Sequence, residues 1–166
     1  TYIGNPSPKI IYGITKSFAY KGFDLSIFIQ EVYGNKIFNA NNINQEGMSV
    51  AENQTLRTLE RWNGQGTSNY MPRAIYGDPN LNTRVSNRYI EDGSYLRIKD
   101  ISLGYTFSQH AIRNLKLSSL RLFASCRNAY TFTNYSGFDP EVAVNGVDYS
   151  VYPVTRTFSI GLNLNL

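Results

Sequence analysis

The chain of 166 residues is poor in the residues from which many functional sites are built. It has one cysteine, Cys126, and one histidine, His110. A single cysteine excludes an internal disulfide framework, and a single histidine excludes a metal site with several histidine ligands. Charged residues make up only 17% of the chain, and the formal net charge of +4 comes from scattered basic residues. This is a weak signal for nucleic acid, so we expect no nucleic-acid partner.

Long apolar runs are also missing, because no stretch approaches about 18 consecutive apolar residues and no transmembrane helix is expected. The sequence instead alternates between apolar and polar residues in five segments. They comprise residues 8–20, 22–33, 94–107, 118–132 and 155–166. Alternation with a period of two is typical of β-strands with one apolar face. The segments exceed the roughly 5–6 residues of an average strand and reach the roughly 9–11 that cross a bilayer, which favours a membrane barrel over a soluble sandwich.

The third of these segments changes phase in its middle. Leu96 and Ile98 share one parity, whereas Ile101 and Leu103 share the other. A slip of one residue would turn every later side chain to the opposite face unless one extra residue restores it. The sequence therefore predicts a β-bulge near Lys99–Asp100.

The connections between the segments differ strongly in length. Residues 20–22 and 108–118 form short turns, whereas residues 34–93 and 133–155 form long loops. Short turns on one side and long loops on the other are typical of an outer-membrane barrel. Within the first long loop, residues 49–62 predict a short helix, since Ser49 and Glu52 have the spacing of a capping box.

Six stretches of sequence form a specific combination. They are IGNPSPK (3–9), YKGFDLSIFIQ (20–30), RWNGQGTSNYMPR (61–73), YIEDGSYLRIKDISLGYTF (89–107), LRLFASCRNAYTFTNYSGFDPEV (120–142) and VDYSVYPVTRTFSIGLNLNL (147–166). With them, nearly the whole chain resembles the C-terminal part of the SusC/RagA-type TonB-dependent outer-membrane transporters of Bacteroidetes. One departure is that many such chains end in an aromatic residue, whereas this one ends in Leu166.

The resemblance implies an all-β fold for residues 1–166. In this fold the chain would supply the last five antiparallel strands of a large, roughly 22-stranded transmembrane β-barrel, with a short helix in a long extracellular loop. The plug and the earlier strands would belong to the parent protein upstream of this segment. Five strands cannot close a barrel, so the edges at 10–20 and 158–166 are expected to pair with other strands of that protein.

The resemblance also implies a function, which is part of a TonB-dependent nutrient importer for glycans or oligopeptides in the cell outer membrane. This segment would form barrel wall and extracellular loops. The implied partners are the rest of the barrel and the plug, a SusD-like surface lipoprotein, the TonB complex through the N-terminal region, and outer-membrane lipid. The residues leave one alternative open, a soluble carbohydrate-binding β-domain, which would need no detergent for extraction.

No group of residues has the pattern of a catalytic, cofactor or metal site, and no enzyme activity is expected. His110 falls in a short turn, and Cys126 has no base nearby in the pattern. Asp78, Asn80 and Asn82 mimic the first three positions of a calcium loop. The glycine and the final glutamate of such a loop are missing, so we expect no metal there.

Two sets of residues are candidates for contact with partners or substrate. The first lies on the polar parity of the strands and is expected to face the barrel lumen, where solvation or pairing with the plug is favoured over substrate contact: Asp24, Gln30, Arg97, Arg121 and Arg127. The second lies in the first long loop: Trp62, Tyr70, Arg73 and Tyr76. Aromatic planes beside amide side chains suit sugar rings or peptide backbones, and they equally suit a protein interface, which we favour.

Overall fold

The computed structural model describes residues 3–142 and 144–166. The chain forms two compact units. The strand unit comprises Pro8–Gly34, Ser94–Asn134 and Pro153–Leu166, and the loop unit comprises the start of the chain up to Ser7 with Asn35–Gly93 and Tyr135–Tyr152. Within the described ranges, every helix is too short or too polar to cross a membrane.

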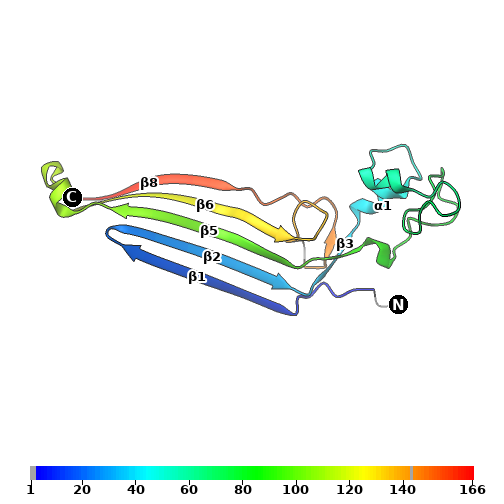
Figure 1. Ribbon diagram of the computed structural model, residues 1–166, viewed down its shortest axis with the longest axis horizontal. Coiled ribbons are helices and arrows are strands. Elements are labelled where there is room, and N and C mark those ends of the chain that lie inside the picture. The colour runs from blue at the N-terminus through cyan, green and yellow to red at the C-terminus, as the bar shows by residue number, and fades with distance from the viewer. Residues whose placement is uncertain (1–2, 143) are drawn as a thin grey trace. The chain divides into compact units, whose positions relative to one another are not determined.

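The strand unit is one antiparallel sheet of five strands (Figure 1). In spatial order the strands are β1 (Ile10–Tyr20), β2 (Phe23–Tyr33), β5 (Tyr95–Thr106), β6 (Ser119–Thr133) and β8 (Thr157–Asn165). The prediction of five antiparallel strands is confirmed, and the predicted bounds agree to within two residues. Over the part of the chain that is described, the sheet is open, because β1 pairs with β2 alone and β8 with β6 alone.

The pairing register sorts the side chains onto two faces of different character. One row across the sheet is apolar in all five strands: Phe18, Leu25, Leu103, Ala124 and Ile160. The next row, on the opposite face, is serine in all five strands: Ser17, Ser26, Ser102, Ser125 and Ser159. The alternation in the sequence is therefore kept in register across the full width of the sheet.

The β-bulge predicted near Lys99–Asp100 is confirmed and lies in β5. In the pairing of β2 with β5, Ile29 lies opposite Ile98 and Phe28 lies opposite Asp100, which makes Lys99 the extra residue. Its amino group donates a hydrogen bond to Gln30 Oε1 at 2.7 Å. Because the extra residue restores the parity, Ile98 and Ile101 lie on the same face of the sheet.

A second irregularity, in β6, has no counterpart in the sequence prediction. Tyr130 pairs with Ile98, and Arg127 pairs with Asp100. Between these two pairs β6 has two residues, whereas β5 has one. Within this step Asn128 has a φ of 51°. Asparagine tolerates this left-handed conformation better than most residues, and its side chain donates to the Thr155 carbonyl oxygen at 3.1 Å.

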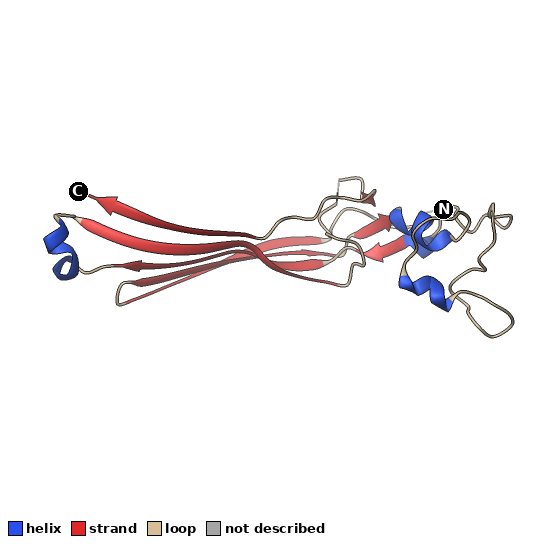
Figure 2. Ribbon diagram, turned by 90° about the horizontal axis from the view of Figure 1, so that it is seen from above, coloured by secondary structure: helices blue, strands red, loops and turns tan. Residues whose placement is uncertain are grey.

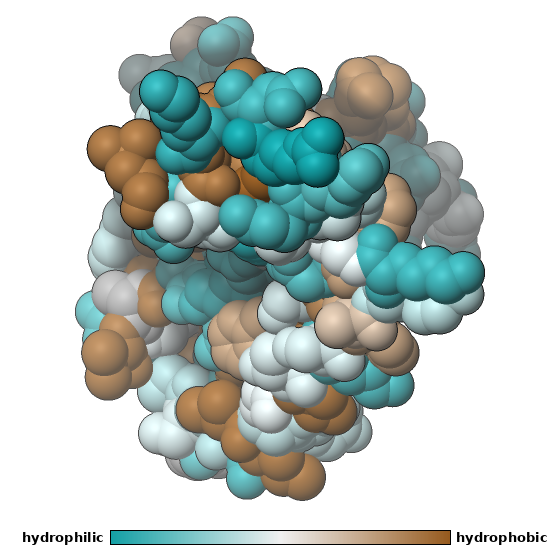
Figure 3. Space-filling view, turned by 90° about the vertical axis from the view of Figure 1, so that its left-hand side faces the viewer, coloured by the Kyte–Doolittle hydropathy of each residue, from teal (hydrophilic) through white to brown (hydrophobic). Residues whose placement is uncertain are grey.

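The two short turns lie at one end of the sheet, and both follow from local geometry (Figure 2). Lys21 and Gly22 link β1 to β2 with φ of 47° and 90°, the positive values of a two-residue type I′ hairpin. The connection from β5 to β6 contains two short helices, α2 (Gln109–Ile112) and η3 (Arg113–Leu115), which the sequence prediction missed. Figure 3 looks onto this end and shows apolar side chains left open beside hydrophilic ones.

The helix predicted at residues 49–62 is wrong. Only a 3-10 helix, η1 (Leu56–Glu60), forms there, and the helix of this loop is α1 (Asn41–Gly47) instead. The apolar residues that were expected to bury one face stay open, with Leu56 83% and Leu59 73% exposed. A short helix is stable only when its apolar face packs against other residues. Because this face stays exposed, the capping pattern at Ser49 is not enough to form the helix.

The loop unit has a small sheet and a core of its own, which the sequence did not predict. Its three strands are β4 (Ile90–Asp92), β3 (Lys36–Asn39) and β7 (Val147–Asp148), in that order, and η2 (Asn87–Tyr89) leads into β4. Ile37 and Tyr89 are completely buried. The Glu91 carboxylate accepts hydrogen bonds from Asn39 at 2.9 Å, Asn42 at 3.1 Å and the Ser136 hydroxyl at 2.7 Å. One carboxylate thus ties three segments of the unit together.

A second buried hydrogen bond in the loop unit lies within its last segment, Tyr135–Tyr152. The Tyr135 hydroxyl donates to Asp148 at 2.5 Å. Burial and then this hydrogen bond hold the pKa of Tyr135 well above its ordinary value. Tyr135 therefore remains a neutral donor under all physiological conditions.

On the serine face of the strand unit, an ion pair bridges β2 and β6 over the strand between them. Arg121 donates to both oxygens of Asp24, at 2.9 Å from Nε and 2.5 Å from Nη2. Gly104 of β5 lies beneath this pair, and a Cβ there would stand 2.3 Å from Arg121 Nη2 and 2.6 Å from Asp24 Oδ1. The absence of a side chain at Gly104 leaves room for the bidentate geometry.

We predict that a side chain at Gly104 abolishes this pair. Asp24→Asn should lower the free energy of unfolding only slightly, since the pair is partly exposed. In a Gly104→Val background, the same Asp24→Asn change should have almost no further effect, because the pair is already broken. A double-mutant cycle in urea on the intact protein measures the difference. Ser102→Val, on the same strand and face, is the control that should leave the Asp24→Asn effect intact, and equal effects in all backgrounds would contradict the prediction.

Candidate functional site

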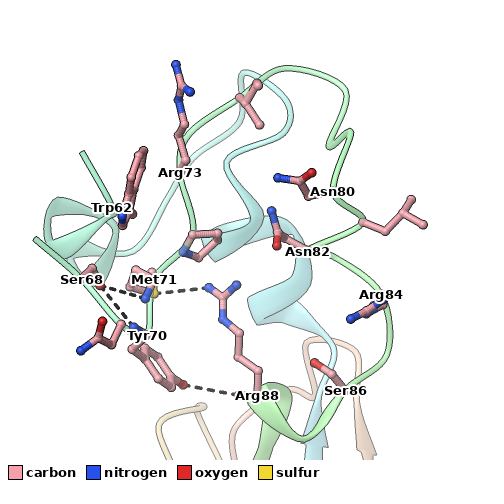
Figure 4. Close-up of a pocket in the computed structure, with 14 residues that line it drawn as sticks. Trp62, Ser68, Tyr70, Met71, Arg73, Asn80, Asn82, Arg84, Ser86 and Arg88 are labelled. Atoms are coloured by element: carbon pink, nitrogen blue, oxygen red, sulfur yellow. Dashed lines mark hydrogen bonds between the residues drawn. The ribbon is translucent and has the colours of Figure 1, made fainter. Parts of the chain in front are cut away.

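The loop unit has an open cavity of about 590 Å³ between two of its segments (Figure 4). Trp62, Tyr70 and Arg73 line it from the first segment, and residues 80–88 supply the facing wall. A cavity of this size lies within the roughly 300–1,000 Å³ of small-molecule sites. It is therefore the candidate binding site of this unit.

Local hydrogen bonds shape the first wall of the cavity. The Trp62 amide donates to the Met71 carbonyl oxygen at 3.2 Å, which brings the ends of this stretch together. Between them the Thr67 hydroxyl accepts from the Asn63 amide at 2.8 Å and donates to the Gly64 carbonyl oxygen at 2.7 Å. Gly64, with a φ of 133°, provides the backbone conformation that this turn requires.

The second wall begins with a turn built around Asp78. This buried carboxylate accepts hydrogen bonds from the Asn82 amide at 2.8 Å, the Thr83 amide at 2.8 Å and the Thr83 hydroxyl at 2.6 Å. Burial by itself would raise the pKa of Asp78, but the hydrogen bonds from Thr83 and Asn82 outweigh it and hold the pKa below its ordinary value. The carboxylate oxygens are occupied by internal donors, and no group of three potential metal ligands occurs among the residues that the structure describes.

At the base of the cavity, Arg88 belongs to a cluster of two arginines around one buried carboxylate, and the other two members, Arg57 and Glu46, lie outside the lining. Glu46 is almost completely buried and lies 2.9 Å from Arg57 and 3.7 Å from Arg88. Both guanidinium groups also face the Tyr70 ring, at 5.2 Å and 5.8 Å from its centroid. One negative charge between two positive ones leaves this cluster with a positive excess.

Three of the four loop candidates come together in the structure. Trp62, Tyr70 and Arg73 line the cavity, whereas Tyr76 is 88% exposed and lies outside the lining. Sequence reasoning missed Arg84 and Arg88, which line the cavity as well. No local sequence pattern marks these two arginines. They reach the cavity only because the whole loop unit folds around it.

The five candidates on the strands share the serine face of the sheet, and each contacts its neighbours. Arg97 is buried, and its Nε donates to the Thr131 hydroxyl at 2.8 Å. Arg127 lies 3.7 Å from Asp100, directly across the strand pair. Asp24 pairs with Arg121, and Gln30 accepts from Lys99, as described above. Whether this face lines a lumen stays a prediction.

Comparison with known proteins covers almost the whole chain, although no protein-family model matches it. TonB-dependent receptor P3 of Formosa agariphila is 34% identical, over 98% of this chain and 17% of the receptor. TonB-dependent receptor SusC of Bacteroides thetaiotaomicron is 27% identical, over 96% of this chain and 15% of SusC. The solved structure of the RagAB peptide importer in its closed-closed state matches with a TM-score of 0.81 at 23% identity, over 95% of this chain and 17% of that one. The resemblance to SusC/RagA-type TonB-dependent receptors is confirmed.

The chain spans about a sixth of the length of these TonB-dependent receptors. The likeness to the solved structure shows a shared fold, in which both the long-stranded sheet and the loop unit find counterparts. These relatives bear the names of receptors and not of enzymes. The cavity therefore lies in a segment that belongs to the TonB-dependent receptor family.

We predict that Asp78→Asn loosens the cavity wall of this receptor segment. An asparagine amide nitrogen cannot accept the bonds from Thr83, and hydrogen bonds to a charged group contribute about 1.5–3 kcal/mol each. Hydrogen exchange at the Asn82 and Thr83 amides should accelerate at least tenfold. Glu60→Gln, an exposed change in the same unit, is the control and should leave exchange unchanged.

The same residue predicts a pH dependence. The folded pKa of Asp78 lies below its unfolded value, so its stabilisation is present above the unfolded pKa and is lost as the pH falls through the folded pKa. The exchange protection of the Asn82 amide should therefore decrease in acid in the natural protein and lose that pH dependence in Asp78→Asn. Identical acid profiles for the two proteins would contradict this role.

Proposed function

We propose that this chain is the C-terminal wall-and-loop segment of a SusC-like TonB-dependent importer in the cell outer membrane, which takes up glycans or oligopeptides. The observation that carries the proposal is the sheet of five long strands with a largely apolar face left open, on which Lys16 and Glu31 are the charged exceptions. Phe18 is 60% and Ile160 82% exposed on this face. Water-soluble proteins rarely leave a continuous apolar surface of this extent uncovered, whereas a bilayer covers it.

Strand length supports the same proposal. β1 and β2 have 11 residues each, and β6 has 15. At about 3.3 Å per residue and a tilt of about 45°, strands of 9–11 residues cross the hydrocarbon core. The apolar face is then the lipid face, and the serine face, with the Arg121–Asp24 pair, lines the lumen towards the plug.

The two outer strands indicate that the wall continues beyond this segment. β1 and β8 are each paired on one side within the described chain. A strand edge in a bilayer leaves backbone N–H and C=O groups without water, at several kcal/mol each. We infer that β1 pairs with an earlier strand of the receptor and β8 with its first strand, which closes the barrel.

The loop unit lies on the extracellular side in this proposal, since both of its long segments leave the sheet at the end opposite the short turns. Its exposed aromatic residues, Tyr76 above all, suit packing against a SusD-like lipoprotein. The cavity residues Trp62, Tyr70 and Arg73 suit contact with the imported molecule. The solved relative is named a peptide importer, which supports import as the activity.

The test is uptake by cells that carry the full-length receptor. Labelled oligosaccharides and oligopeptides should accumulate only when both the receptor and TonB are present, and the receptor should need detergent for extraction from the outer membrane. Uptake that is independent of TonB would overturn the proposal. So would release of the receptor from membranes by carbonate alone, which would favour a soluble β-domain.

We predict a strong difference between the two faces of β8. Leu162→Arg places a charge on the proposed lipid face and should cost about 2–4 kcal/mol near the bilayer midplane. Ser159→Arg, on the serine face opposite Ser125, is the control and should cost little. Urea unfolding of the full-length receptor in lipid vesicles measures both. Spin labels at 161 and 162 should likewise differ in exposure to a lipid-soluble quencher, and equal exposure would refute the assignment of faces.

A further inference from the structure

The cavity of the loop unit has an unbalanced charge. Its lining includes Arg73, Arg84 and Arg88 and, among the residues described, no aspartate or glutamate. Figure 4 shows Arg88 reaching into the middle between Met71 and Asn82, with Arg84 on the far side and Arg73 at the upper rim. Three guanidinium groups around one cavity attract a negatively charged ligand.

The acidic residues behind the walls do not cancel this charge. Asp78 is turned into its own loop, where it accepts three hydrogen bonds from Asn82 and Thr83. Glu46 lies under the floor and is already shared by Arg57 and Arg88. Arg73 and Arg84 are both exposed and make no ion pair in the described chain. They are therefore the two arginines that a ligand can engage without breaking an existing contact.

The rest of the lining favours a sugar over other anions. Trp62 and Tyr70 supply aromatic planes, and Asn80 and Asn82 supply amide groups that both donate and accept hydrogen bonds. Sugar rings offer apolar C–H faces and a fringe of hydroxyl groups, which match these two kinds of side chain. Arginine adds a planar fork that binds a carboxylate or sulfate with two parallel hydrogen bonds.

We propose that this cavity recognises an acidic sugar unit, one that bears a carboxylate or a sulfate, within an oligosaccharide. The proposal rests on the proposed function, because it specifies the substrate class of the same import. Arg73 and Arg84 bind the anionic group, and Trp62 and the asparagines hold the ring. Arg88 is a positioning residue, since Glu46 and Tyr70 hold it in the floor.

Calorimetric titration of the purified full-length receptor tests the charge requirement. The probes are tetragalacturonate, an alginate tetramer and a sulfated galactan tetramer, each compared with its neutral form, the methyl ester for the two uronates and the unsulfated tetramer for the galactan. At least one acidic probe should bind ten times more tightly than its neutral form, and the preference should weaken with added salt. Preference for a uronate identifies the carboxylate as the source of charge, and preference for the galactan identifies the sulfate.

Two variants test the residues. The double variant Arg73→Gln/Arg84→Gln should abolish the preference, so that the acidic probe binds no more tightly than its neutral form. Unchanged hydrogen exchange at the Asn82 amide then shows that the site still folds. Arg61→Gln removes one positive charge from an exposed position outside the cavity lining and should leave the preference intact.

Three results would overturn the inference. They are the absence of preference for every acidic probe, a preference that survives the double variant, and an equally tight, arginine-dependent binding of a glutamate-rich pentapeptide. None of them affects the proposed import function if TonB-dependent uptake of neutral glycans or peptides persists. Loss of that uptake in cells with the natural receptor would instead remove the import function itself.

Discussion

The pairing register of five strands is the constraint on which the strand unit depends. Side chains alternate with a period of two, so an error of one residue in any pair would exchange an apolar row for a polar one. The row of serines across the whole sheet shows that no such error occurs. Lys99 is what makes this possible, because as the bulge residue it absorbs the phase change of β5. The small residues of the serine face in turn give the Arg121 and Asp24 side chains room to meet across a strand.

The loop unit depends on a different constraint, which is the satisfaction of buried charge. Buried Glu46 and half-buried Glu91 are each surrounded by donors that come from distant parts of the chain, and buried Asp78 by donors from its own turn. A buried carboxylate without such donors would be strongly destabilising. The cavity lies beside this cluster, and the charged side chains of its lining are all arginines among the described residues. Glu46 engages Arg88, whereas Arg73 and Arg84 of the lining make no ion pair within the described chain.

The sequence was sufficient to predict those features that depend on local, periodic patterns. Parity alone located the five strands and the bulge at Lys99, and the Tyr20–Phe23 turn follows from the Lys21–Gly22 pair. It failed where tertiary contacts decide. The capping pattern at Ser49 was real, yet Leu56 and Leu59 found nothing to pack against, and the helix formed at α1 instead. The burial of Ile37 beside Tyr89, like the placing of Arg84 and Arg88 around one cavity, joins residues whose relation no short pattern reveals.

The two ends of the long segment Asn35–Gly93 are fastened to each other. The Gly93 amide donates to the Asn35 carbonyl oxygen at 3.0 Å, and immediately outside them the Gly34 amide donates to the Ser94 hydroxyl at 2.9 Å. The entropic cost of closing such a loop rises by only about 0.6 kcal/mol for each doubling of its length. A segment of another length and composition can therefore replace this one between β2 and β5 at little cost to the sheet. The sheet therefore sets little limit on the length of what the chain inserts between Gly34 and Ser94, and the limit on this segment comes instead from its partners in residues 135–152.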